Sequence, residues 1–167
     1  VVNNYSAGTS TIGMTVAGAG SFYGAVALAR DVTFYATNGA TVTVSGSITG
    51  AGDIVKDGPG TAVLTGAISA AGGLALKGGT LQMASADVAT RTNIAWTVSA
   101  DTGTGTLAAD GYSFTGTTVA FTFDGTLDRD NTYVVATGTT GVPAAAGLTR
   151  GWKLAQRSGG LTLYCPP

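Results

Sequence analysis

The side chains best suited by type and spacing to catalysis are two aspartates, Asp53 and Asp57. Two carboxylates can hydrolyse a glycosidic bond when one acts as an acid and the other as a base or nucleophile. The two aspartates flank a short apolar segment, and Asp57 precedes Gly58-Pro59-Gly60, a sequence typical of a tight turn. A turn-forming role is therefore favoured over a catalytic one, and no residue is assigned as catalytic.

The chain contains no histidine, which excludes Ser-His-Asp and Cys-His catalysis and a histidine-ligated metal. The remaining metal candidate is a weak calcium site in an acidic loop formed by Asp124, Asp128, Asp130 and Asn131. Calcium takes about six to eight oxygen ligands. However, the EF-hand spacing and its closing glutamate are absent, and Arg129 lies within the loop. An ordinary hairpin loop is favoured, and no cofactor is expected.

Four aromatic residues could stack against sugar rings if they were exposed, namely Trp96, Trp152, Tyr112 and Tyr133. Aromatic side chains carry much of the buried area in a small protein, so a place in the core is favoured over a glycan platform. The single cysteine, Cys165, is interpreted as a tail thiol, with an intermolecular cross-link as the alternative. The sequon Asn4-Tyr5-Ser6 is weak evidence of glycosylation.

The composition indicates which elements must position these residues. The 167 residues include 27 glycines and nine acidic residues, all of them aspartate, and only 10% of the chain is charged. Few strong helix formers remain for a surface, whereas Thr, Val and short alternating apolar runs favour strands. The net charge of −1 gives no basic patch for nucleic acid. No apolar run approaches the roughly 20 residues of a membrane-spanning helix.

A repeat is visible in the middle of the chain. An apolar run ending in lysine, then glycine, then Gly-Thr and another apolar strand occurs around Lys56 and again around Lys77, 21 positions later. This spacing is about one coil of a parallel β-helix. In such a coil, glycines form the turns, and inward-facing Val, Leu and Ile stack on the next coil.

The segment from Ser45 to Gly66, continuing to Gly78-Gly79-Thr80-Leu81, resembles the autotransporter-associated β-strand repeat. The matching features are the Gly-x-Gly turns, the apolar pair before lysine, the Gly-x-Gly-Thr turn and the closing Gly-Thr-Leu, over about residues 40–86. The resemblance implies a right-handed parallel β-helix in a secreted or surface-displayed bacterial passenger-like protein. It implies no catalytic residues.

The fold prediction is therefore all-β, with β-helix coils over residues 1–86 and a C-terminal β-sandwich-like module over residues 87–167. Before the repeat, strands are expected over 21–28 and 32–36, and within it over 41–44 and 63–65. In the module they are expected over 94–99, 112–115, 118–123, 132–137, 152–155 and 161–164. One short helix is expected within 83–92, and a loop over 143–150.

These features predict a non-enzymatic extracellular structural protein, displayed on a cell surface or self-assembling as a fibre or surface layer. The chain starts with Val1-Val2-Asn3-Asn4, without methionine, so we expect a processed product or a piece of a longer chain. An uncapped solenoid end favours contacts with other copies, head to tail, as a homo-oligomer or filament. The alternative is an adhesin module that binds surface glycans or Ca²⁺, and a polysaccharide-cleaving enzyme is the third choice.

Overall fold

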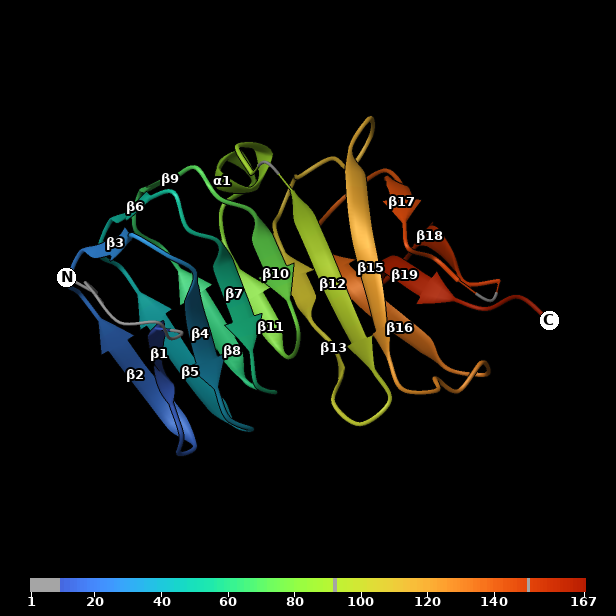
Figure 1. The fold of residues 1–167 in the computed structure, drawn as a ribbon, viewed down its shortest axis with the longest axis horizontal. Helices are drawn as coiled ribbons and strands as arrows, with labels where there is room; N and C mark the ends of the chain where they lie inside the picture. The colour runs from blue at the N-terminus through green and yellow to red at the C-terminus, as the bar shows by residue number, and fades with distance from the viewer. Residues whose placement is uncertain (1–9, 92, 150) are drawn as a thin grey trace.

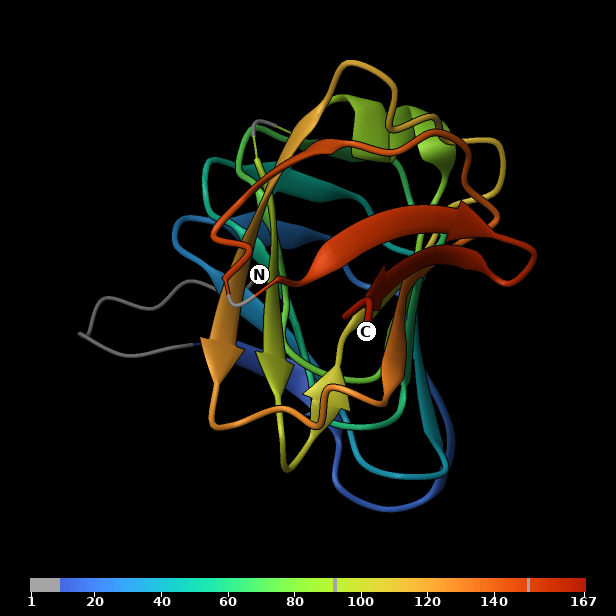
Figure 2. The ribbon, with the colours of Figure 1, turned by 90° about the vertical axis from the view of Figure 1, so that its right-hand side faces the viewer.

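The chain winds into a parallel β-solenoid in the computed structural model, which describes residues 10–91, 93–149 and 151–167 (Figure 1). The fold is all-β, as the sequence predicts. Viewed end-on, the strands surround a central interior (Figure 2), and buried apolar side chains form a core there. The sequon at Asn4 and the first nine residues of the predicted β-helix lie outside the described residues.

Three sheets form the walls of the solenoid. Along the chain, successive coils place their strands side by side in the same sheet. We call them sheets A, B and C. In order across the sheet, sheet A contains β1 (Ser10–Met14), β4 (Val32–Ala36), β7 (Ile54–Asp57), β10 (Leu74–Leu76), β12 (Ile94–Ser99), β15 (Thr118–Asp124) and β17 (Ala144–Ala146), with β13 (Gly103–Thr104) antiparallel to β12. Sheet B contains β2 (Gly18–Phe22), β5 (Ala40–Val44), β8 (Thr61–Leu64), β11 (Thr80–Gln82), β14 (Thr106–Ala108), β16 (Thr132–Thr137), β19 (Gly160–Tyr164) and β18 (Lys153–Arg157).

Sheet C is shorter than the other two sheets. It consists of β3 (Val26–Leu28), β6 (Ile48–Gly50) and β9 (Ile68–Ala70). In the next coil, helix α1 (Ser85–Ala89) follows β11, where the earlier coils have a strand of sheet C. The helix buries Val88 against the core, and its position agrees with the helix expected within 83–92. It is the only helix among the described residues, and none there is long and apolar enough to span a membrane.

Alternation along the strands produces the core. In β4, Val32, Phe34 and Ala36 are buried, whereas the intervening Thr33 and Tyr35 are partly exposed. Strand β5 has the same alternation, with its valines inward and its threonines outward. Because neighbouring strands are in register, inward side chains stack on their counterparts in the next coil. The sequence pattern predicts this correctly.

Glycine at one corner of the coil is required by close packing of backbones. A Cβ atom on Gly46 would overlap the carbonyl oxygen of Gly24 in the preceding coil, and one on Gly66 would overlap that of Gly46. The corner between sheets B and C therefore has space only for hydrogen at these positions. This packing explains why glycine recurs at the coil spacing.

The register corrects the repeat alignment that the lysines suggest. Lys56 pairs with Leu76, 20 positions later, rather than with Lys77. A slip of one residue reverses which face of a strand a side chain occupies. Lys56 accordingly points inward and is fully buried, whereas Lys77 is exposed. Identical residue types in the two copies thus have opposite environments.

The solenoid extends further than the sequence predicts, because the parallel sheets continue beyond residue 86. Strand β10 pairs with β12 across that position, and β12 pairs in parallel with β15. The coil lengthens here: Thr118 pairs with Ala144, 26 positions later. The antiparallel C-terminal part consists of β19 on β16 and β18 on β19, and this hairpin lies across the end of the solenoid (Figure 2).

Most of the predicted strands are observed, with three differences. The segment 21–28 is divided between β2 and β3 by a turn at Gly24, and 112–115 contributes only an isolated bridge between Ser113 and Thr140. The loop predicted over 143–150 is wrong at its start, because Ala144–Ala146 forms β17. Three consecutive alanines carry little strand propensity, so pairing with β15 determines this element.

Candidate functional site

The two aspartates of the predicted hydrolytic pair lie at opposite ends of β7. Four residues of extended chain separate their Cα atoms by about 13 Å. The Oδ1 atom of Asp53 accepts a hydrogen bond from the Gly73 amide at 2.6 Å, and that of Asp57 accepts one from the Gly58 amide at 2.7 Å. Asp57 therefore stabilises its own turn, in agreement with the turn-forming interpretation, whereas Asp53 binds the backbone of the next coil.

Asp53 belongs to a ladder that links three coils at the corner before sheet A. The Asp31 carboxylate accepts a hydrogen bond from the Asp53 amide at 2.9 Å, and Asp53 does the same for Gly73 in the next coil. The residues after them, Val32, Ile54 and Leu74, are paired in sheet A. The ladder therefore helps to hold successive coils in register.

Replacing Asp53 with alanine is expected to lower the free energy of unfolding by about 1–3 kcal/mol, because the Gly73 amide loses its acceptor. Asp53→Asn keeps an acceptor oxygen at the same place and should lose less than half as much. Urea denaturation of both variants measures the difference. Equal losses for the two variants would contradict the assignment of the ladder.

Among the described residues, Lys56 is the one charged side chain that is buried. The local sequence does not identify it as a functional residue. Its Nζ atom donates hydrogen bonds to the carbonyl oxygens of Asp57 and Gly58, each at 2.7 Å, and of Gly78 at 3.1 Å. Gly78 lies in the next coil, so the ammonium group joins two coils. Burial lowers the pKa of Lys56 to about 8, while the Asp57 carboxylate acts in the opposite direction. The three N–H groups of the ammonium thus have three backbone acceptors. Lys56 therefore stabilises the corner between two successive coils.

The acidic loop that follows β15 is organised around Asp128. One carboxylate oxygen of Asp128 accepts a hydrogen bond from the Asp130 amide at 3.0 Å, and the other accepts one from Asn131 Nδ2 at 3.3 Å. This is the geometry of an Asx turn. The structure brings Asp128, Asp130 and Asn131 together in one exposed turn, whereas Asp124 is the last residue of β15. In the described part of the chain, no three Asp or Cys side chains are grouped closely enough to hold a metal ion.

Three of the four candidate stacking aromatics are buried. Trp96 is 1% exposed, Trp152 6% and Tyr112 8%, whereas Tyr133 is partly buried. Trp96 stacks on Phe121, with ring centroids 5.4 Å apart, and its indole N–H donates a hydrogen bond to the Val135 carbonyl oxygen at 3.1 Å. These contacts confirm the core interpretation for Trp96.

A hollow of about 250 Å³ lies beside Trp152 at the C-terminal end of the solenoid. It is lined by Phe123, Gly125, Thr126, Leu127, Arg129, Thr149 and Trp152. The Trp152 ring packs between Phe123 and Tyr133, with centroid distances of 6.1 Å and 5.8 Å. The hollow thus has an apolar wall, two hydroxyl-bearing threonines and one guanidinium group. This combination can bind a small polar ligand that has an apolar face.

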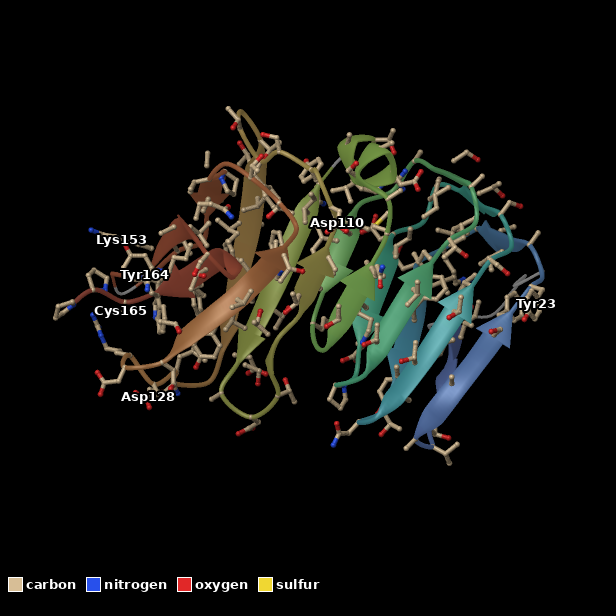
Figure 3. All side chains as sticks on the ribbon, turned by 180° about the vertical axis from the view of Figure 1, so that it is seen from behind. Tyr23, Asp110, Asp128, Lys153, Tyr164 and Cys165 are labelled. Carbon is tan, nitrogen blue, oxygen red and sulfur yellow. The ribbon has the colours of Figure 1, made fainter. Side chains whose placement is uncertain are left out.

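Sequence reasoning located the loop beside this hollow but missed its lining residues. The arginine that weakens the calcium interpretation, Arg129, is itself part of the lining. Thr149 and Trp152 come from the segment after β17, 26 and 29 residues after Phe123 in the sequence. Asp128 and Cys165 lie at this same end of the molecule (Figure 3). Cys165 is half-buried there, and its role in cross-linking stays a prediction.

The comparisons with known proteins return no match: no family model, no curated protein and no solved structure is significantly similar to this chain. The β-solenoid is therefore established by the structure itself.

Proposed function

We propose that this protein is a non-enzymatic extracellular structural protein, similar to an autotransporter passenger, that is displayed on a cell surface. The observation that carries the proposal is the use of polar side chains at the coil corners. Asp31, Asp53 and Lys56 each bind backbone groups of a neighbouring coil, so they stabilise the contact between successive coils. A chain that uses its polar side chains in this way is suited to form an extended, regular scaffold.

The register supports the resemblance to the autotransporter-associated repeat. Gly46 lies against Gly66, and Gly52 lies against Gly72, so the two copies of the motif occupy equivalent corners of successive coils. The strand before the Gly58-Pro59-Gly60 turn pairs with the strand before Gly78-Gly79. The motif is therefore one coil long, as a repeat with a structural function requires.

The proposal is tested by labelling intact cells of the source organism with a membrane-impermeant amine reagent. Exposed Lys77 and Lys153 should be modified on intact cells, and extracellular protease should remove the protein from the surface. Recovery of unlabelled protein only after the cells are lysed would overturn the proposal. This experiment does not depend on the oligomeric state.

The second candidate function is glycan binding at the hollow beside Trp152, which is favoured by its apolar wall and its hydroxyl and guanidinium groups. If this candidate is right, isothermal titration with a panel of neutral and acidic oligosaccharides should detect a ligand. Arg129→Ala should then weaken binding by about tenfold or more, because charged hydrogen bonds contribute more than neutral ones. Lys153→Ala, which removes an exposed cation outside the lining, is the matched control.

Calcium binding at the acidic loop is tested in the same series. A bound ion would raise the melting temperature by an amount that grows with the logarithm of its concentration divided by its dissociation constant. Asp130→Asn should abolish that increase, whereas Asp101→Asn, in another exposed loop, should leave it unchanged. No response to calcium or to any glycan of the panel would exclude the binding-module alternative for those ligands.

A further inference from the structure

One asparagine of the chain precedes a glycine, and the fold places this pair in an exposed turn. Asn38 and Gly39 lie in the turn that joins β4 to β5 (Figure 1). The Ala40 amide donates a hydrogen bond to the Thr37 carbonyl oxygen at 3.0 Å, so the four residues form a β-turn. Asn38 and Gly39 are both exposed, and Gly39 has a φ of +71°, which favours glycine at the third position of a turn.

This turn is longer than the turn at the same corner of the next coil. Between paired positions of the flanking strands it spans residues 36–40, whereas in the next coil the corner spans only residues 58–60. A Cβ atom on Gly60 would overlap the Thr37 carbonyl oxygen, whereas one on Gly39 would lie 3.4 Å from the nearest atom of the preceding coil. The tip of the longer turn therefore lies outside the close-packed corner, where water reaches it.

An asparagine-glycine pair in this setting can rearrange without an enzyme, since asparagine is a thermolabile residue. The Gly39 backbone nitrogen attacks Cγ of Asn38 and forms a C–N bond, and the side-chain –NH2 leaves with the Gly39 proton as ammonia. Water then opens the resulting succinimide at either carbonyl, which gives aspartate or isoaspartate. The attacking nitrogen must not be held elsewhere. Within residues 10–91, 93–149 and 151–167, the Gly39 N–H has no hydrogen-bond acceptor.

The other asparagines in the described part of the chain lack these features. Asn93 and Asn131 are followed by Ile94 and Thr132, which are the first residues of β12 and β16. A β-branched side chain crowds its own backbone nitrogen, and strand pairing holds the main chain extended. The Asn131 side-chain amide also donates a hydrogen bond to the Asp128 carboxylate at 3.3 Å. Both asparagines therefore serve as internal references for Asn38.

We propose that Asn38 is a site of spontaneous deamidation, so that molecules of this protein accumulate aspartate and isoaspartate at this position with time. The modification adds a negative charge to the turn. As isoaspartate it also adds a methylene group to the main chain between β4 and β5. Because the change lies between the strands, β4 and β5 are expected to stay paired with their neighbours. This inference goes beyond the proposed function and does not depend on where the protein is displayed.

The test is incubation of the folded protein at mildly alkaline pH, with peptide mapping of samples taken over several days. The tryptic peptide 31–56 contains Asn38 and no other asparagine, and it should gain the mass difference between –OH and –NH2. An isoaspartyl methyltransferase with S-adenosylmethionine should label the same peptide. The peptides that contain Asn93 and Asn131 should stay unchanged over the same period. An unchanged peptide 31–56, or equal modification of all three peptides, would overturn the proposal.

Two further measurements separate the exposed turn from a general lability of the chain. The rate in the folded protein should lie within about tenfold of the rate in the guanidinium-unfolded chain, whereas a slower folded rate would mean that the reaction waits for unfolding and would overturn the proposal. Asn38→Gln keeps the amide but must close a larger ring, so the more acidic species seen by ion exchange should disappear. Asn131→Gln, in another exposed turn, is the matched control and should leave that species unchanged. Persistence of the species in Asn38→Gln would place the modification elsewhere.

Discussion

Replacing Trp96 with alanine is expected to lower the free energy of unfolding by about 3–5 kcal/mol, the range for removing a large buried aromatic side chain. The indole ring is 1% exposed, stacks on Phe121 and lies 6.1 Å from Phe114, measured between ring centroids. These contacts connect β12 with β15 and with the segment after β14. The loss can be measured by urea denaturation monitored by far-ultraviolet circular dichroism.

Trp96→Phe is the matched variant, because it keeps an aromatic ring and removes the hydrogen bond to the Val135 carbonyl oxygen. Its expected loss is about 1–2 kcal/mol, from the unpaired carbonyl and the smaller ring. An alanine variant that loses less than about 1 kcal/mol would show that this part of the solenoid packs differently.

The stability of the protein is expected to rise with pH by about 2 kcal/mol between pH 7.5 and 9.5, because of Lys56. The ordinary lysine pKa is 10.5, and burial lowers the pKa of Lys56 to about 8 in the folded protein. Over this range the unfolded chain keeps a proton that the folded protein releases, so raising the pH favours folding. Above this range the rise is opposed, since burial raises the pKa of Tyr112.

The control for this prediction is Lys77→Met, which removes an exposed lysine and should leave the rise intact. Lys56→Met removes the titrating group and should abolish it. Chemical denaturation at intervals of half a pH unit provides the measurement. A flat profile in the unmodified protein would mean that the three carbonyl oxygens hold the ammonium charge strongly enough to offset its burial.

Alternation and turn residues are sufficient to predict much of the solenoid. Alternation of apolar and polar residues between glycine-rich turns predicts strands around Val42, Val63 and Phe121, and each is a strand in the structure. Long-range pairing is not visible in this way. The sequence does not reveal the coils after residue 86, because the spacing between paired residues lengthens to 25 or 26 and the glycines no longer recur at a fixed interval.

The candidate site is less predictable than the strands, because it too depends on long-range pairing between coils. Lys56 shares the inward register of Ile54, so strict alternation along β7 would have shown it to be buried. The similarity to Lys77 concealed this. The hollow beside Trp152 joins residues of β15 and its loop to residues after β17, and no local pattern connects them. Pairing of Thr118 with Ala144 brings these segments together.

The different ends of the solenoid give its unfolding a direction. Each coil bonds only to the coils before and after it, so an interior coil is protected from both sides. Within residues 10–91, 93–149 and 151–167, β1, β2 and β3 each pair on one side alone. Amide exchange should therefore begin at β1 to β3 and advance coil by coil, reaching β16 and β19 last because the terminal hairpin ties them together.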